Sequence, residues 1–119
     1  RPVNPGNLQR LQLLLDYIHE HYANPLSLTA LAAQIPISRE NCCRFFRQMT
    51  GCTISEYLND YRISRSIHLM KTTELSVSSI SALTGFSSAS RFAAAFRAKT
   101  GCSPSEYRRN HCSPSPEHL

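Results

Sequence analysis

Long apolar runs are missing from this sequence. No segment is apolar over the length needed to cross a bilayer, and no signal peptide is visible, so we expect a soluble protein. Zinc-binding patterns are missing too, since no C-x-x-C pair and no paired Cys/His spacing occurs. The five cysteines are odd in number and too sparse for a disulfide scaffold. We therefore expect reduced thiols, no metal and no cofactor, with redox sensing by the adjacent Cys42 and Cys43 as an open alternative.

Acidic residues are absent between Glu74 and Glu106, although this stretch contains three basic residues. Over the 119 residues the net charge is +5, and the pI is near 9.2. A basic balance favours polyanionic partners such as nucleic acid, but many proteins without such partners are equally basic. The length allows one domain, or two very small subdomains that share an element.

The segment 53–70 is predicted to be a helix whose apolar side changes midway. It begins with a capping box formed by Thr53 and Glu56. At 100° per residue, two apolar groups fall on roughly opposite sides: Ile54, Tyr57, Leu58 and Tyr61 on one, and Ile63, Ile67 and Met70 on the other. A surface helix needs only one apolar stripe. This segment is therefore predicted to connect two separate cores, the first group packing in one and the second group in the other.

Apolar spacing and capping residues predict six further helices. In the first half they run over 8–22 with Asn7 as N-cap, from Ser27 to Pro36, and from Ser38 to Gly51. In the second half they run from Ser76 to Gly85, from Ser88 to Gly101, and from the capping box Ser103–Glu106 to about Asn110. Val77, Ile80 and Leu83 are expected to face the core. We therefore predict an all-α fold of seven helices.

A helix-turn-helix is predicted between residues 27 and 51. Only a few residues separate its two helices, so they must cross steeply, and the second is left free to project outward. The residues it projects are mostly polar: Arg39, Glu40, Asn41, Cys43, Arg44 and Arg47.

The two halves of the chain repeat each other. The pattern Phe-Arg-x-x-Thr-Gly-Cys-x-x-Ser-Glu-Tyr occurs at 46–57 and again at 96–107, with eight identities at an offset of 50. Upstream the offset is 49, which places one extra residue early in the third helix of the second copy. Each half thus contains a helix-turn-helix. Two outward helices fit adjacent major grooves of B-DNA, about 34 Å apart, at an asymmetric site. A helical bundle duplicated only for packing is the alternative.

The chain resembles the C-terminal DNA-binding domain of the AraC/XylS family of bacterial transcription regulators over about 8–110. The resemblance rests on Tyr57-Leu58-Asn59-x-x-Arg62, on Gly85-Phe86-Ser87, and on Phe96-Arg97-x-x-x-Gly101-x-x-Pro104-x-x-Tyr107-Arg108. It implies two homeodomain-like helix-turn-helix units whose third and sixth helices bind double-stranded DNA in the major groove. It also implies a cytoplasmic, nucleoid-associated activator that recruits RNA polymerase. An upstream effector or dimerisation domain is then missing, consistent with a start at Arg1 rather than Met.

On this basis we expect five parts. They are a linker remnant (1–7), a first helix-turn-helix subdomain (8–52), a linker helix (53–71), a second helix-turn-helix subdomain (72–110) and a flexible tail (111–119).

The resemblance also implies a DNA-contacting surface. The expected base-reading residues are Arg39, Glu40, Cys43 and Arg44 in the first unit and Ala89, Ser90, Arg91, Ala93 and Ala94 in the second. The expected backbone contacts are Ser38, Arg47, Ser87, Ser88, Arg97 and Lys99. Arg44 is the strongest candidate, because a guanidinium can bond guanine O6 and N7 together. Alanine cannot hydrogen-bond a base, so sequence specificity is expected mainly from the first unit.

Some residues depart from the family pattern or have an expected structural role. Arg62 is expected to bridge the two halves rather than to touch DNA. Pro36 stands where glycine is common and cannot adopt positive φ, so the first turn should differ locally. Ser66 and Ser81 replace alanines, and each needs a hydrogen bond or a boundary position.

The sequence bears on two other functional classes. An enzyme is disfavoured, because nothing in the sequence brings Cys43 together with His68 or His19 as nucleophile and base, and no oxyanion device is evident. A helical protein-interaction module remains the alternative to DNA binding.

Overall fold

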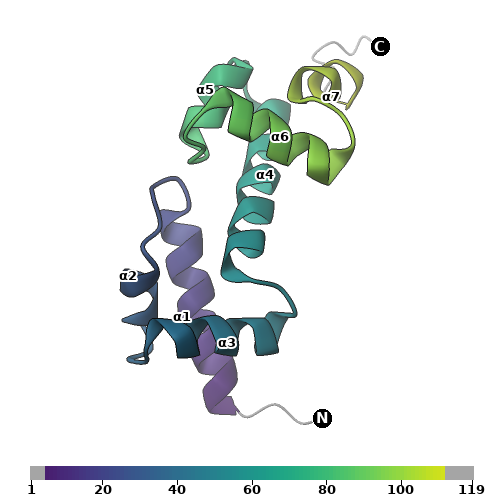
Figure 1. Cartoon of the computed structure of the whole chain (residues 1–119). Coiled ribbons are helices and arrows are strands. Elements are labelled where there is room, and N and C mark those ends of the chain that lie inside the picture. The colour runs from purple at the N-terminus through teal and green to yellow at the C-terminus, as the bar shows by residue number, and fades with distance from the viewer. Residues whose placement is uncertain (1–4, 112–119) are drawn as a thin grey trace. The chain divides into compact units, whose positions relative to one another are not determined.

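The structure, a computed structural model, describes residues 5–111. Within that range it contains seven α-helices and no strand, which confirms the all-α prediction (Figure 1). The helices are α1 (Pro5–His21), α2 (Leu28–Ala32), α3 (Arg39–Thr50), α4 (Ile54–Thr72), α5 (Val77–Leu83), α6 (Ala89–Thr100) and α7 (Pro104–His111). None of the helices in this range is both long and apolar enough to span a membrane.

Serine caps begin four of the helices as the sequence predicts. The hydroxyl oxygens of Ser27, Ser38, Ser76 and Ser88 each accept a hydrogen bond from the N–H three residues later, at 3.1–3.2 Å. Each such cap is worth about 1 kcal/mol relative to alanine. The helices α4 and α7 instead begin with reciprocal capping boxes, in which the hydroxyls of Thr53 and Ser103 and the carboxylates of Glu56 and Glu106 satisfy each other's backbone N–H groups.

Two predicted helix boundaries are wrong, and so is the predicted position of the extra residue in the second copy. The first helix begins at Pro5, inside the segment expected as a linker remnant, so Asn7 lies in its first turn and is not the N-cap. Proline suits that position, since its missing N–H needs no partner there. The helix α2 ends at Ala32, four residues before Pro36. The extra residue of the second copy lies before α6, because the offset between caps changes from 49 at Ser27 and Ser76 to 50 at Ser38 and Ser88.

The chain forms two compact units, which divide after Leu58. The first core comprises Leu14, Ile18, Leu31, Ala32, Ile35, Cys42 and Phe46. The second comprises Ile63, Met70, Ile80, Phe92 and Phe96. In α4, Ile54, Tyr57 and Leu58 pack on the first core, whereas Ile63, Ile67 and Met70 belong to the second. The predicted change of side along this helix is confirmed, although Tyr61 is half-buried and falls in the second unit.

The repeated aromatic residues pack in the same way in both units. Phe46 meets Tyr57 edge to face with ring centroids 5.6 Å apart, and Phe96 meets Tyr107 edge to face at 5.3 Å. Edge-to-face contacts add about 0.5–1.5 kcal/mol beyond the burial of the rings. The repeat of Phe and Tyr in the sequence therefore reflects one packing motif used twice.

The inward face of α5 differs from the prediction. Leu83 was expected in the core but is 52% exposed, because the buried stripe runs through Ile80, Ser81 and Thr84. The hydroxyl of Thr84 donates to the Ile80 carbonyl at 2.8 Å, and that of Ser81 donates to the Ser88 carbonyl at 3.5 Å. These hydrogen bonds satisfy polar groups that would otherwise be costly to bury.

Ser66 on α4 is also fully buried, and its hydroxyl donates to the Ile63 carbonyl at 2.6 Å. The hydrogen bonds expected for the two serines that replace alanines are thus both present.

The subdomain limits predicted above stay a prediction, and residues 1–4 of the linker remnant and 112–119 of the tail lie outside the described range.

Candidate nucleic-acid interface

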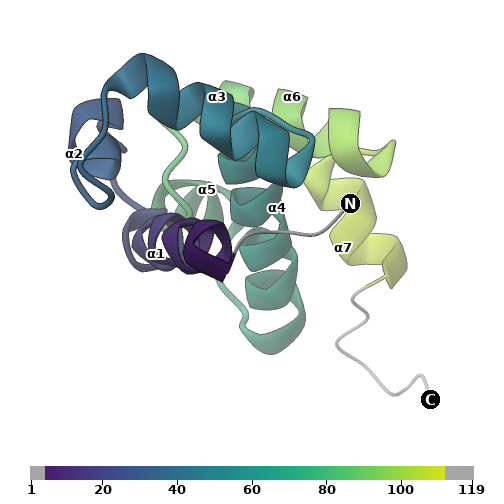
Figure 2. The same ribbon diagram turned by 90° about the horizontal axis from the view of Figure 1, so that it is seen from below.

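Within the first unit, α2 and α3 cross steeply, as two views of the chain show (Figures 1 and 2). Buried Cys42 and Phe46 fix one side of α3 to the core. The residues expected to read bases or contact the backbone from this helix are all exposed: Arg39, which begins the helix, and Glu40, Cys43, Arg44 and Arg47. This is the geometry of a helix-turn-helix, in which the second helix is held by its apolar side and presents its polar side to solvent.

The arginines of α3 are available to an external anion. Within residues 5–111, no ion pair joins Arg39, Arg44 or Arg47 to a carboxylate. Arg44 donates one hydrogen bond to the side chain of Asn41 at 3.1 Å, on the exposed surface. A guanidinium has five N–H donors, so this bond leaves most of them for a base or a phosphate.

The N-terminus of α3 adds backbone donors to this surface. Ser38 is exposed, and its hydroxyl oxygen accepts from the Asn41 N–H. That bond uses a lone pair, so the hydroxyl hydrogen can still donate to a phosphate. Helix N-termini favour anions through their unbonded N–H groups and the helix dipole. Glu40, in the same first turn, is stabilised by that dipole and is the one negative charge on this face.

The exposed face of α6 is less polar than that of α3. Ala89, Ser90, Arg91 and Ala94 are exposed, whereas Ala93 is half-buried although its counterpart Cys43 is exposed. Ser87 and Ser88 are exposed before the helix. Arg91 is thus the one cation among the base-reading residues expected on this helix.

Arg47 and Arg97 occupy equivalent positions in the two units, each near the carboxylate of a capping box. The bond from the Thr53 N–H lowers the pKa of Glu56, and the charge of Arg47 lowers it further. In the same way, the Ser103 N–H and then Arg97 and Arg109 lower the pKa of Glu106. Both carboxylates are fully solvent-exposed, so these are weak, salt-screened interactions.

Lys99 and Arg62 have partners within the second unit. The ammonium of Lys99 lies 3.3 Å from a carboxylate oxygen of Asp60, and both side chains are about half exposed, so a phosphate would have to compete with this pair. The guanidinium of Arg62 lies over the ring of Phe86, 5.9 Å from its centroid, and burial lowers the pKa of Arg62. Its predicted role in bridging the halves stays a prediction.

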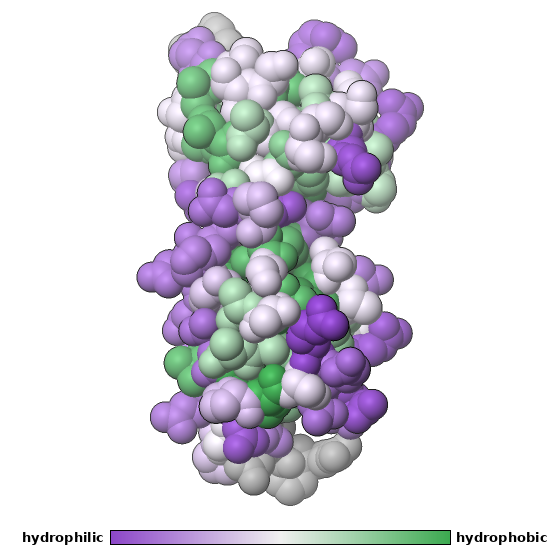
Figure 3. Space-filling model, turned by 60° about the vertical axis from the view of Figure 1, so that its left-hand side comes forward, coloured by the Kyte–Doolittle hydropathy of each residue, from purple (hydrophilic) through white to green (hydrophobic). Residues whose placement is uncertain are grey.

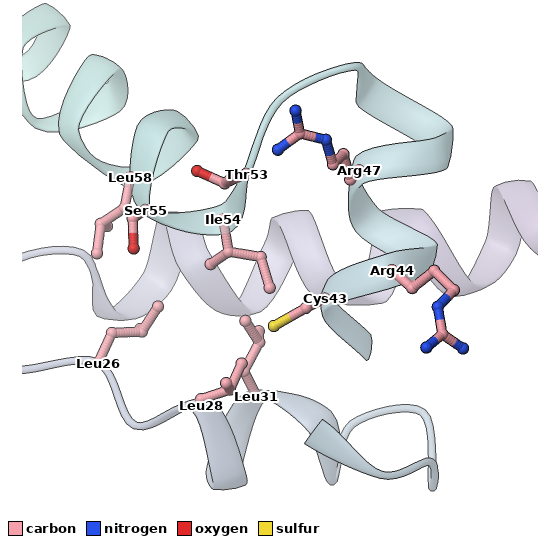
Figure 4. Close-up of a pocket in the computed structure, with 10 residues that line it drawn as sticks. All are labelled: Leu26, Leu28, Leu31, Cys43, Arg44, Arg47, Thr53, Ile54, Ser55 and Leu58. Carbon is pink, nitrogen blue, oxygen red and sulfur yellow. The ribbon is translucent and has the colours of Figure 1, made fainter. Parts of the chain in front are cut away.

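An open groove of about 420 Å³ lies beside α3 in the first unit (Figure 4). Its apolar lining consists of Leu26, Leu28, Leu31, Ile54 and Leu58, from α2, the segment before it and the start of α4. Its polar lining consists of Cys43, Arg44, Arg47, Thr53 and Ser55. In the close-up, Cys43 points into the groove, Arg47 is directed toward the start of α4, and the guanidinium of Arg44 points away.

The cysteines and acidic residues do not form a metal site in the part of the chain described. Across residues 5–111 no group of three or more His, Cys, Asp or Glu side chains is close enough to hold an ion. Four free thiols lie in this range, of which Cys42 is buried and Cys43 exposed. Burial, followed by the neighbouring Cys43, raises the pKa of Cys42, which makes that thiol a poor nucleophile.

A family model described as a helix-turn-helix domain matches residues 31–110. The chain belongs to the AraC/XylS family of helix-turn-helix regulators. The match spans α3, α4, α5 and α6 in full and all of α7 except its last residue. It places the exposed faces of α3 and α6 within a DNA-binding domain of AraC type.

Relatives of this AraC/XylS domain agree in sequence and in fold. The transcriptional activator RhaS of Escherichia coli is 35% identical over 104 residues, which are 87% of this chain and 37% of RhaS. The DNA-binding domain of AdpA, solved in complex with a target DNA, is 28% identical with a TM-score of 0.83, covering 91% of this chain and 97% of that one. An AraC-type regulator from Chromobacterium violaceum is also 28% identical, with a TM-score of 0.82, covering 94% of this chain and all of that one. The chain spans about a third of the length of the curated relatives it matches.

Several residues around this AraC/XylS surface were not found by sequence reasoning. The groove beside α3 unites Leu26, Leu28 and Leu58 from three segments, and no periodicity within one helix reveals it. The pairing of Asp60 with Lys99 also joins distant positions. At the repeat offset of 50, Leu58 in the first unit corresponds to Arg108 in the second. This difference between the two copies was the signal in the sequence that could have indicated the groove.

On the face shown in Figure 3, hydrophilic side chains surround smaller apolar areas. Large apolar side chains that are exposed in the described range are Leu8, Leu13, Leu75 and Leu83. Scattered exposed leucines are normal in soluble proteins and need no functional explanation.

Proposed function

We propose that this domain binds an asymmetric DNA site by inserting α3 and α6 into successive major grooves. The observation that carries the proposal is the exposed face of α3, where three arginines without a carboxylate partner in the described range flank a helix fixed by buried Phe46. In this arrangement, Arg44 bonds a guanine and Arg39 lies beside it. Glu40 accepts from a cytosine N4, and Cys43 contacts the neighbouring base.

The second recognition helix makes a different set of contacts. Ala89, Ala93 and Ala94 can touch a thymine methyl group but cannot hydrogen-bond a base edge. Ser90 and Arg91 supply the polar contacts available on this face. The second half-site therefore contributes less direct readout than the first.

Backbone contacts set the register of both helices on the duplex. They come from Ser38 and Arg47 in the first unit, and from Ser87, Ser88, Arg97 and Lys99 in the second. Lys99 exchanges Asp60 for a phosphate on binding, which lowers its net contribution. The segment 53–71 serves as the linker helix between subdomains 8–52 and 72–110.

A relative supports a proposed regulatory role for the whole protein. RhaS is an activator, and this chain is 35% identical to it over 104 residues. We infer that the whole protein is likewise an activator that recruits RNA polymerase in the bacterial cytoplasm, at the nucleoid. We also propose that the whole protein has a further domain for effector sensing or dimerisation, since this chain spans only about a third of the length of these relatives.

Footprinting on operators scrambled one half at a time tests this function. We expect protection of one face over about two helical turns and a larger loss of affinity when the half read by α3 is scrambled. Equal losses of affinity on scrambling either half would contradict the assignment of specificity to the first unit.

Salt dependence separates DNA binding from the protein-interaction alternative. A DNA-binding domain loses affinity steeply as salt rises, because counterions are released from the phosphates. A shallow slope, together with no preference among operators, would favour a helical protein-interaction module instead.

A further inference from the structure

The repeat provides an internal comparison for the groove beside α3. The position of Leu58 in the first unit is occupied by Arg108 in the second. The guanidinium of Arg108 donates to the carbonyl of Leu75 and, at 3.3 Å, to the carbonyl of Thr73. In the second unit, a long side chain thus ties α7 to the segment before α5.

The first unit has no side chain of that length at this position. Leu58 ends at its two methyl groups and cannot donate to the segment before α2. Leu26, the counterpart of Leu75, is half-buried and lines the groove together with Leu28 and Leu58. The change from arginine to leucine therefore accompanies an apolar groove of about 420 Å³.

The size and lining of this groove are those of a small-molecule site. Such sites are clefts of roughly 300–1,000 Å³, mostly apolar, with a few polar groups that fix the orientation of the ligand. Five of the ten lining residues here are leucine or isoleucine. Figure 4 shows Leu26, Leu28 and Ile54 directed toward a common space.

The polar rim favours an anion. The guanidinium of Arg44 points away from the groove, so Arg47 is the cation available to it among the lining residues, none of which is acidic. Arg47 is directed toward the start of α4, where the hydroxyls of Thr53 and Ser55 also line the groove. Arg47 lies close enough to the capping-box carboxylate of Glu56 to lower its pKa, but a guanidinium has donors for two carboxylates.

We propose that this groove binds a small molecule with an unbranched alkyl body and one carboxylate. The alkyl body lies along Leu26, Leu28 and Leu58, and the carboxylate bonds Arg47 at the start of α4. Where Arg47 also contacts phosphate, as in the proposed function, the bound carboxylate weakens the affinity for DNA. This last step rests on the proposed function, whereas the binding site itself does not.

Titration of the full 119-residue chain with sodium decanoate tests the site directly. We expect saturable shifts in the methyl NMR signals of Leu26, Leu28, Ile54 and Leu58, and none in Leu83, which is exposed outside the groove. Decanol has a similar alkyl body but no charge, and should bind about tenfold more weakly, as should decanoate to Arg47→Gln.

Matched variants separate the site from general hydrophobic binding. Leu58→Arg introduces the side chain of the second unit and should abolish decanoate binding, while Leu83→Ala should leave it unchanged. Circular dichroism establishes that each variant is folded. If Leu58→Arg unfolds the first unit, the comparison of decanoate with decanol on the unaltered chain still decides the question.

The results that overturn the proposal are specific. They are shifts that do not saturate, equal binding of decanol and decanoate, or full decanoate binding by folded Leu58→Arg. Operator binding without decanoate is measured separately by fluorescence anisotropy. A chain that binds decanoate but no operator refutes the proposed function alone, and a chain that binds operator but no decanoate refutes this site alone.

Discussion

The two helix-turn-helix units have separate cores built in the same way, but their exposed surfaces differ. Phe46 and Phe96 are both fully buried, and both recognition helices end at a left-handed glycine, Gly51 at φ 82° and Gly101 at φ 88°. On the exposed side, Arg44 faces solvent in α3, whereas Ala94 stands at the same position in α6. The buried phenylalanines and the terminal glycines are thus the same in both copies, whereas the exposed residues of the two helices differ.

The turns of the two units differ as well. In the second unit Gly85 adopts φ 92°, a conformation that other residues rarely occupy. In the first unit Pro36 stands at the matching position, and proline cannot adopt a positive φ. Accordingly α2 ends at Ala32 and a longer turn leads to Ser38, whereas α5 continues to Leu83. The change from glycine to proline in the turn is thus accompanied by a shorter helix before it, α2 compared with α5.

Removal of the buried phenylalanine from either core should produce the largest loss of stability. Phe46→Ala or Phe96→Ala leaves a cavity in a fully buried site and should cost about 3–5 kcal/mol of unfolding free energy. Urea denaturation followed by methyl NMR would measure each unit separately. We expect Phe46→Ala to lower the stability of the first unit more than that of the second. Leu83→Ala, at an exposed position, is the control and should change stability by no more than about 0.5 kcal/mol.

Exchange of the exterior residues tests the difference in readout. Arg44→Ala should lose about 1–3 kcal/mol of discrimination at a guanine in the first half-site, while weak non-specific binding remains. Ala94→Arg should create a new guanine preference in the second half-site, because α6 then carries the arginine of α3. Competition binding with single-base operator variants measures both. Unchanged specificity in Arg44→Ala would show that α3 is not the reading helix.

The caps of the recognition helices should be equivalent despite their different exteriors. Ser38→Ala and Ser88→Ala each remove one side-chain acceptor from a backbone N–H at 3.1–3.2 Å. We expect both to cost about 1 kcal/mol of stability in their own unit. Urea denaturation would measure the two losses. If they differed from each other by more than about 1 kcal/mol, the two caps would not have equivalent roles.

The capping-box carboxylates should give a small acid-dependent effect in both units. The pKa values of Glu56 and Glu106 are lowered in the folded state, by the hydrogen bonds of Thr53 and Ser103 first. Their contribution is therefore present above the unfolded pKa of about 4.3 and is lost as pH falls through the lowered folded value. Denaturation at several pH values should show this loss weakened in Glu56→Gln and Glu106→Gln. Glu74→Gln, outside the capping boxes, should retain it.

Local signals predicted the fold well because they act between close neighbours. A serine cap or a capping box joins residues three positions apart, so Ser27, Ser38 and Thr53 could be assigned from the sequence. The prediction was wrong in α5, where two different sides of the helix could have packed against the core. Leu83 is more apolar than Ser81, yet the stripe through Ile80 and Thr84 buries the serine. Tertiary packing decided that choice.

The candidate site was only partly predictable. Exposure of Arg44 and Arg47 follows from the helical period once Phe46 is placed in the core. Arg39 lies on the same side as Phe46 by that period and is exposed as the first residue of α3. The groove depends on three segments, and its shape could not follow from any one of them. The role of these residues in binding DNA stays a prediction, since it depends on a complex rather than on the folding of the chain.

The change of sides along α4 makes one helix a shared component of two folding reactions. Ile54, Tyr57 and Leu58 are stabilised by one core and Ile63, Ile67 and Met70 by the other, so neither core holds the whole helix. Helices shorter than about 12–15 residues are marginal alone in water. Melting of either unit would therefore leave its half of α4 without support and shorten the helix. The helices α3 and α6 would then lose a continuous connection. If the chain binds DNA as proposed, a mutation in one core would therefore reduce affinity at the half-site of the other.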